Sequence, residues 1–268
     1  MQSLARRVLH AELNFAASRG DGGIWSNAQP EIITQQLLAH DVEISDARLL
    51  PSPSSLEAEG FEVCRMALSG ASWTDPQWIA QHYLPRACEL VGELTGAAHV
   101  APFYGGLTLT RDTGDPQSAR AAEFVHLDQT RASVAPFLEM DASPEIRAKY
   151  RRVKIFNVWR PITPPPQDVP LALCDQRSLA ESDWTIGRTV EPSFPDGVPY
   201  ISSVFNPRQK WFYFSDLSLD EVIIFKGYDS DRTAPMGCLH GAFRNPHVPV
   251  GRIPRASVEL RLFAFFEA

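Results

Sequence analysis

The chain has 268 residues, of which 44% are hydrophobic and 21% are charged. These values are ordinary for a globular protein and exclude a disordered or fibrous one. The net charge is −7 and the 25 basic residues are scattered, which argues against a nucleic-acid partner. No apolar run is long enough to span a bilayer, and the N-terminal segment lacks the apolar core of a signal peptide. We therefore expect a cytoplasmic protein with no membrane partner.

The four cysteines, Cys64, Cys88, Cys174 and Cys238, lie far apart with no CxxC pair. This spacing excludes a zinc ribbon and a thioredoxin-like redox motif, and we expect reduced thiols. The 22 prolines and 16 glycines break the chain into short segments, which favours strands over long helices. Barrels and sandwiches of strands reach this length as one domain, so we expect a single domain over residues 1–268.

The clearest predicted helix runs from about residue 75 to residue 94. Thr74 and Gln77 have the spacing of a capping box at its start. Pro85 should kink or divide this helix, because proline cannot donate the helical hydrogen bond. A second helix is predicted to start at residues 143–146, where serine, proline and glutamate suit the cap and the first turn.

Most other segments are short and rich in β-branched and aromatic residues, which is typical of strands. The predicted strands cover residues 100–109, 153–159, 210–214, 222–228 and 257–266. Helices that precede a β-rich half indicate an α+β chain that is mainly β. We expect the strands to close into a barrel or sandwich, because closure avoids long free edges.

His126-Leu127-Asp128 follows the apolar pair Phe124-Val125 and is expected at the end of a strand. Residues two apart on an extended backbone point the same way, so the imidazole and the carboxylate could bind one ion. An iron(II) site that also accepts O2 and an organic co-substrate needs a third protein ligand on the same face. The spacing alone is weak support, since His10-Ala11-Glu12 shares it, and a structural histidine is an equal interpretation of His126.

His240 is the preferred candidate for the third ligand, because Gly241 and Ala242 are small and leave room beside it. The alternative is a core histidine that is hydrogen-bonded to a backbone carbonyl. His247 lies between two prolines and is expected in a loop, and the other histidines lack comparable motifs. His240 is therefore the best choice on the sequence without being a forced one.

Arg255-Ala256-Ser257 opens the predicted C-terminal strand. The planar arginine side chain matches a carboxylate, and a serine two positions on shares its face and can donate to the same group. This pair could hold the distal carboxylate of 2-oxoglutarate. Glu259 and Arg261 follow on that face, so the alternative is a ladder of ion pairs on a solvated strand. Arg261 is a second candidate for the co-substrate, and we prefer Arg255 for its serine partner.

Several motifs in the same order resemble the cephem-methoxylase, gibberellin-desaturase and AsaB-like group of 2-oxoglutarate oxygenases from fungal and bacterial metabolism. The likeness covers most of the chain. The motifs are Leu94-Thr95-Gly96-Ala97, His126-Leu127-Asp128, Asn157-Val158-Trp159-Arg160-Pro161, Pro170-Leu171-Ala172-Leu173-Cys174-Asp175, Phe225-Lys226-Gly227-Tyr228-Asp229-Ser230, His240-Gly241-Ala242-Phe243 and Arg255-Ala256-Ser257-Val258-Glu259-Leu260-Arg261.

The resemblance implies a double-stranded β-helix, or jelly-roll, core over residues 98–268, with N-terminal strands and a supporting helix over residues 1–97. It implies that iron(II) is held by His126, Asp128 and His240. It also implies that 2-oxoglutarate and O2 are co-substrates. The expected reaction is hydroxylation or desaturation of a small-molecule secondary metabolite, with release of succinate and CO2.

In the same way, the resemblance implies that Arg255 binds 2-oxoglutarate, with Ser257 or Arg261 contributing. Four residues of the family motifs are candidates for the substrate pocket wall, although packing is the commoner role of such side chains: Asn157, Trp159, Arg160 and Tyr228. Cys238 could face the metal, but a buried and inert thiol is the preferred interpretation.

Two other functions are left open by the residues themselves. One is a barrel that binds a small ligand without turnover. The other is a cupin-type metalloenzyme that needs no 2-oxoglutarate and in which Arg255 is structural. Association into a homodimer is also open.

Overall fold

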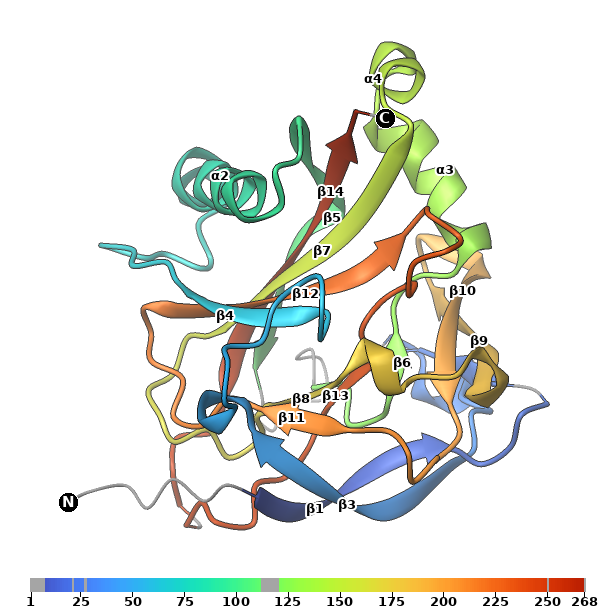
Figure 1. The fold of residues 1–268 in the computed structure, drawn as a ribbon, viewed down its shortest axis with the longest axis vertical. Coiled ribbons are helices and arrows are strands. Elements are labelled where there is room, and N and C mark those ends of the chain that lie inside the picture. Colours follow the sequence, from blue (N-terminus) through green and yellow to red (C-terminus); the bar gives the residue numbers. More distant parts are fainter. Residues whose placement is uncertain (1–7, 21, 27, 112–120, 250, 268) are drawn as a thin grey trace.

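The computed structural model describes residues 8–20, 22–26, 28–111, 121–249 and 251–267, without the side chains of residues 104–106 and 111. Within these residues the strands form two sheets (Figure 1). One has nine strands in the order β1-β3-β11-β8-β13-β6-β10-β9-β2, and the other has five in the order β4-β12-β7-β14-β5. The expectation of a mainly β chain is thereby confirmed.

The nine-stranded sheet contains β1 (Val8–Ala16), β2 (Ile24–Trp25), β3 (Leu37–Asp46), β6 (His126–Leu127), β8 (Leu171–Cys174), β9 (Trp184–Glu191), β10 (Phe194–Ser203), β11 (Trp211–Tyr213) and β13 (His240–Ala242). The five-stranded sheet contains β4 (Phe61–Arg65), β5 (His99–Arg111), β7 (Arg152–Pro161), β12 (Glu221–Asp229) and β14 (Ala256–Phe266). All five strands predicted for the later part of the chain are present. Strands from the first 97 residues extend both sheets, because β3 pairs with β11 and β4 pairs with β12.

Helices cover the ends and one face of the sheets. They are α1 (Pro76–Trp78), the π-helical turn η3 (Ile79–Tyr83), α2 (Leu84–Thr95), α3 (Arg131–Asp141) and α4 (Pro144–Lys149). Short 3-10 turns are η1 (Pro30–Ile32), η2 (Ala47–Leu49), η4 (Gln176–Ser178) and η5 (Glu181–Asp183). None of the described helices is long and apolar enough to cross a membrane.

The first predicted helix is confirmed as the run of α1, η3 and α2. Pro85 lies in the first turn of α2, directly after the π-helical turn that divides the run. The predicted cap is wrong: the side chain of Asp75, not Thr74, accepts the hydrogen bond from the Gln77 amide at 2.9 Å. The helix start at Ser143 is confirmed, since its hydroxyl accepts from the Ile146 amide. Helix α3 was not predicted.

Strand β14 shows how alternation places the site. Its residues Val258, Leu260 and Leu262 pack in one buried cluster with Leu90 and Val91 of α2. Since neighbouring residues of a strand point to opposite faces, residues 257, 259 and 261 face the other way, toward the nine-stranded sheet. Figure 1 shows α2 on the outer side of the five-stranded sheet.

The two sheets share a core. One buried cluster joins Ile155 and Phe263 of the five-stranded sheet to Leu127, Ile201 and Trp211 of the nine-stranded sheet. The inner faces of the two sheets therefore pack against each other, and side chains of β14 that are polar lie inside the molecule. A polar group at such a place needs partners, and this directs attention to the space between the sheets.

Candidate functional site

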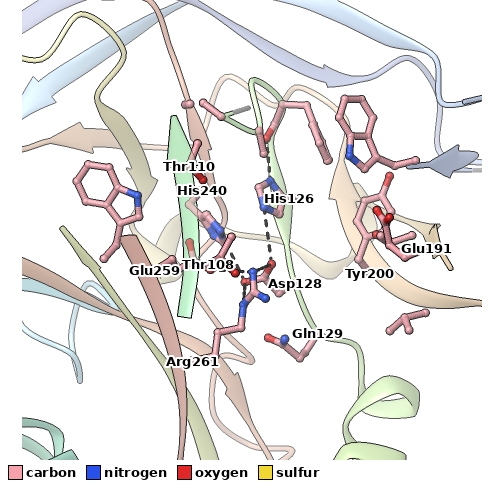
Figure 2. A pocket seen from close by; sticks show the side chains of 18 of the residues that line it. Thr108, Thr110, His126, Asp128, Gln129, Glu191, Tyr200, His240, Glu259 and Arg261 are labelled. Atoms are coloured by element: carbon pink, nitrogen blue, oxygen red, sulfur yellow. Dashed lines mark hydrogen bonds and ion pairs between the residues drawn. The ribbon is translucent and has the colours of Figure 1, made fainter. Parts of the chain in front are cut away.

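Three side chains converge between the sheets (Figure 2). His126 of β6 lies directly opposite His240 of β13 in the antiparallel ladder, and Asp128 follows β6. One ligand atom from each of the three residues lies within 4.8 Å of the other two. Within the described residues, no other three histidine, cysteine, aspartate or glutamate side chains meet in this way.

Both imidazole rings are oriented by the backbone. Nδ1 of His126 lies 2.9 Å from the carbonyl oxygen of Phe124, and Nδ1 of His240 lies 3.2 Å from that of Cys238. A carbonyl can only accept, so each Nδ1 carries a proton, and in the neutral ring Nε2 is the nitrogen with the lone pair. The hydrogen bond from His240 to a carbonyl, predicted as the alternative to metal binding, therefore accompanies a ring whose other nitrogen can still act as a ligand.

The two lone pairs face one carboxylate. Nε2 of His126 lies 3.8 Å from Oδ1 of Asp128, and Nε2 of His240 lies 3.9 Å from Oδ2. Two neutral nitrogens and one carboxylate on a common face are the donor set of a non-haem iron(II) centre. The residues present thus fit such an ion by their chemistry.

The protonation states of His240 and Asp128 also suit the binding of a metal cation. Burial and the neighbouring His126 lower the pKa of His240 to about 3, so this ring is neutral at neutral pH. Burial alone would raise the pKa of Asp128, but Arg261 and the two histidines outweigh it and hold the pKa well below its usual range. Neither residue has to lose a proton when it binds a metal.

A cavity of about 430 Å³ extends from these three side chains between the sheets. At another part of its wall are Arg255 and Ser257, together with Thr108 and Thr110 of β5. Arg255 is 5% exposed, and its guanidinium carbon lies 5.4 Å from the centre of the Trp159 ring.

Arg255 forms no ion pair with a described carboxylate, although Asp168, Glu123 and Glu259 lie near enough to raise its pKa, and its Nε has no hydrogen-bond partner among the described residues. Burial lowers the pKa of Arg255 to about 10, which leaves it cationic at neutral pH. A buried cation without a partner is costly, because it has lost its water. An anion in the cavity would supply the missing partner.

Three comparisons with known proteins bear on this arrangement. A family model described as "Oxidoreductase/YMDC permease-like domain" matches residues 13–265. The Fe(II)/2-oxoglutarate-dependent dioxygenase nvfI of Aspergillus novofumigatus is 30% identical over 84% of this chain and 83% of that protein. The hydroxylase/desaturase efuI of Hormonema carpetanum is 27% identical over 97% of this chain and 96% of that protein. A solved structure of the iron and alpha-ketoglutarate-dependent endoperoxidase NvfI superposes with a TM-score of 0.84 at 26% identity, covering 98% of this chain and 99% of that chain.

The chain belongs to the iron(II)- and 2-oxoglutarate-dependent oxygenases. Its cofactor is iron(II), and its co-substrates are 2-oxoglutarate and O2. The fold is the jelly roll expected from the resemblance.

In this oxygenase the two candidate arginines have different surroundings. Arg261 lies in contact with both Asp128 and Glu259, at 2.8 and 2.7 Å from Nη2. The ion pairs expected along β14 thus include Glu259 and Arg261, but they lie beside the cavity rather than on a solvated face. Arg255 takes no part in them, which favours Arg255 over Arg261 for the co-substrate.

The residues expected in the pocket wall divide into two groups. Trp159 lines the cavity of the oxygenase, and Asn157 donates a hydrogen bond to Asp128 at its edge. Arg160 lies on the opposite face of β7, where it donates to the carbonyl of Met66 and lies over the Trp73 ring. The prediction that Arg160 lines the pocket is therefore corrected. Residues whose numbers differ by one or three, such as Trp159 and Arg160, point to opposite faces of a strand.

Tyr228 is also not among the residues that line the cavity of the oxygenase. It follows a bulge in β12 between Lys226 and Tyr228, where the pairing register with β7 shifts. Its ring packs in the core cluster shared by the two sheets. A bulge changes which face a side chain takes, and the sequence offered only Gly227 as its signal.

Other lining residues were not expected from the sequence. Gln129 could have been found, because it directly follows a candidate ligand. The aromatic part of the wall comes from distant segments with no shared motif: Trp25, Phe103, Phe124, Phe137, Phe194 and Tyr200. Hydrophobic patterning marks such residues as buried, but it does not say which of them meet at one cavity.

Cys238 of the oxygenase is buried, and its thiol donates to the carbonyl of Cys174 at 3.2 Å. Burial raises the pKa of Cys238 well above its ordinary value, which keeps the thiol protonated and unreactive. The preferred interpretation of an inert thiol is confirmed. All four cysteines are free.

Proposed function

We propose that His126, Asp128 and His240 hold iron(II), that Arg255 and Ser257 hold the distal carboxylate of 2-oxoglutarate, and that the enzyme oxidises a small, largely apolar molecule. One observation carries the proposal: three converging ligand side chains and one buried arginine without an ion pair to a described carboxylate line the same cavity.

The chemistry that iron(II) supplies when bound is the activation of O2 for oxidation of a C–H bond, coupled to conversion of 2-oxoglutarate to succinate and CO2. The protein's contribution is placement. His126 and His240 offer neutral nitrogens held by backbone carbonyls, and Asp128 offers a negative charge. Arg255 binds the far end of the co-substrate and so fixes its orientation in the cavity.

The rest of the wall supports an uncharged substrate. Its large side chains are aromatic, and outside the metal and anchor groups the charged described residues on the cavity wall are Glu191, Glu259 and Arg261, of which Arg261 is already paired with Asp128 and Glu259. No described cation is left there to pair with a substrate carboxylate or phosphate. The names of the relatives support hydroxylation or desaturation of a secondary metabolite as the reaction.

The test is an anaerobic titration of the metal-free protein with iron(II) and then 2-oxoglutarate, followed by the visible charge-transfer band of the chelated keto acid. His240→Ala should lose iron binding and the band together. Arg255→Ala should keep iron but weaken 2-oxoglutarate binding about 10- to 100-fold, because it removes charge-assisted hydrogen bonds.

Arg177→Ala is the control, because that arginine pairs with Asp175 and Glu59 at the surface, and it should behave as the wild type. Unchanged 2-oxoglutarate affinity in Arg255→Ala would refute the anchor. A wild-type protein that binds no iron would refute the metal site. Membership of the oxygenase family argues against the barrel without turnover and against the enzyme that needs no 2-oxoglutarate.

A further inference from the structure

The carboxylate of Asp128 is held by two neighbouring side chains of the five-stranded sheet. Arg261 donates from Nε to Oδ2 at 3.1 Å and from Nη2 to Oδ1 at 2.8 Å. Asn157 donates from Nδ2 to Oδ2 at 2.8 Å. Figure 2 shows the guanidinium group of Arg261 directly beside this carboxylate.

The same two donors also reach a second carboxylate. Nδ2 of Asn157 donates to Oε1 of Glu259 at 3.1 Å, and Nη2 of Arg261 lies 2.7 Å from the same oxygen. The arrangement is fixed by the backbone, because Asn157 and Arg261 are direct partners in the β7–β14 ladder. Gly227 makes room for it, since a Cβ there would lie 2.6 Å from Oδ1 of Asn157.

Counting lone pairs shows which oxygen of Asp128 can still bind a metal. A carboxylate oxygen has two acceptor positions. Oδ2 accepts from both Arg261 and Asn157 and is therefore filled, whereas Oδ1 accepts one hydrogen bond and keeps one position. Oδ1 lies 3.8 Å from Nε2 of His126, and the filled Oδ2 lies 3.9 Å from Nε2 of His240.

We propose that Arg261 and Asn157 are positioning residues that make Asp128 a ligand through Oδ1 alone. The proposal rests on the proposed metal site and deepens it. A carboxylate that bound through both oxygens would occupy one more position on the metal, and that position is needed by a co-substrate that chelates with two oxygens.

Glu259 completes the network through its charge. Arg261 alone would cancel the negative charge of Asp128 and weaken the attraction for a cation. With Glu259 included, two carboxylates face one guanidinium, so Arg261 is shared and does not pair with Asp128 alone. Burial outweighs the attraction of Arg261 and raises the pKa of Glu259, and the 2.7 Å contact holds the two side chains together.

The test uses manganese(II) and oxalate. Oxalate chelates a metal through two oxygens but lacks the distal carboxylate that Arg255 is proposed to hold. Protein saturated with manganese(II) is titrated with oxalate and, separately, with 2-oxoglutarate in a calorimeter. Arg261→Lys, which keeps the charge but loses the planar fork, should weaken both chelators about tenfold or more. Asn157→Ala should also weaken the binding of both chelators. If Arg261→Lys does not fold, the affinities of Asn157→Ala test the proposal instead.

Two controls separate positioning from other causes. Arg255→Ala should weaken 2-oxoglutarate and leave oxalate within about twofold of the wild type. Arg152→Lys removes an equivalent fork, since Arg152 on β7 donates to both oxygens of buried Asp229 at 2.9 and 2.7 Å. It should lower stability without a change in oxalate affinity.

Each contrary outcome has a distinct meaning. Wild-type oxalate affinity in both Arg261→Lys and Asn157→Ala would overturn the proposal. Loss of 2-oxoglutarate binding alone in Arg261→Lys would also overturn it, because it would make Arg261 the anchor. If Arg152→Lys lost as much oxalate affinity as Arg261→Lys, the loss would reflect lower stability in general, and the proposal would be overturned. A wild-type protein that binds manganese(II) but neither chelator would instead refute the proposed function.

Discussion

A buried arginine costs free energy unless other groups compensate its charge, and three arginines on or next to β7 and β14 differ in how this is done. Arg261 contacts two carboxylates, and Arg160 has a carbonyl oxygen and the face of Trp73. Among the described residues, Arg255 has the face of Trp159 beside its guanidinium group and no ion pair, although Asp168, Glu123 and Glu259 lie near enough to raise its pKa. At the scale of single residues, this difference is what separates a structural or positioning arginine from one that is available to a ligand.

A residue away from the site gives a test of pH dependence. Partial burial alone raises the pKa of Glu221, but hydrogen bonds from Arg48, at 2.9 and 2.8 Å, and from the Ser218 amide outweigh it and lower the pKa below 4.5. A lowered carboxylate pKa contributes stability above the unfolded pKa, and this contribution is lost as the pH falls through the folded pKa.

We therefore expect Glu221→Gln to lower the free energy of unfolding by about 1 kcal/mol at pH 7, a value limited by solvent screening. The difference from the wild type should shrink below about pH 4 as the carboxylate takes up a proton. Urea denaturation at both pH values measures it. A difference that is the same at both would show that the ionised carboxylate is not the cause.

At the scale of elements, α2 supports the site from outside. Its buried residues pack on the outer face of β14, and the inner face of the same strand carries Ser257, Glu259 and Arg261. The helix ends at Gly96, which has a φ of 67° and so takes the left-handed conformation that glycine favours. The helix contributes no residue to the cavity wall, so its role is to stabilise the sheet.

Two leucines one turn apart on α2 test this role. Leu90 is 6% exposed within the apolar cluster, whereas Leu94 is 40% exposed. Leu90→Ala should lower the free energy of unfolding by about 2 to 5 kcal/mol, and Leu94→Ala should change it by no more than about 0.5 kcal/mol. Denaturant unfolding measures both. Metal affinity should stay at the wild-type value in each folded variant, and a selective loss of metal binding in Leu90→Ala would contradict a purely supporting role.

At the scale of the whole molecule, the proposed ligand sites belong to different sheets. The histidines lie in the nine-stranded sheet, and Ser257 lies in the five-stranded sheet with Arg255 next to it. A co-substrate bound at both would connect the two sheets. Strands from the first 97 residues also extend both sheets, and for this reason we propose a single oxygenase domain over residues 1–268.

Ligand binding should therefore stabilise the whole fold. With metal bound, 2-oxoglutarate at about 100 times its Kd should raise the free energy of unfolding by about 2.7 kcal/mol. Denaturant titrations of the metal-free, metal-loaded and fully loaded protein measure each increment. Arg255→Ala should keep the increment from the metal and lose most of the increment from 2-oxoglutarate at the same concentration. If 2-oxoglutarate stabilised Arg255→Ala as much as the wild type, a residue other than Arg255 would hold the distal carboxylate.

The sequence by itself determined five strands of the later chain and the candidate ligands, because these depend on local properties, whereas β8, β9, β10 and β13 were not predicted. Branched and aromatic residues favour extended backbone, and residues two apart share a face, as in His126-Leu127-Asp128 and Arg255-Ala256-Ser257. The same rule would have excluded Arg160 from the face of Asn157 and Trp159.

Only the tertiary structure decided which distant segments meet. The pairing of His126 with His240, and of Asn157 with Arg261, depends on strand register between segments about 100 residues apart. The bulge at Tyr228 and the gathering of aromatic side chains from distant positions on the cavity wall depend on packing between sheets. Burial also decided the charge of His240 and the uncompensated state of Arg255, because desolvation depends on the folded surroundings and not on neighbours in the chain.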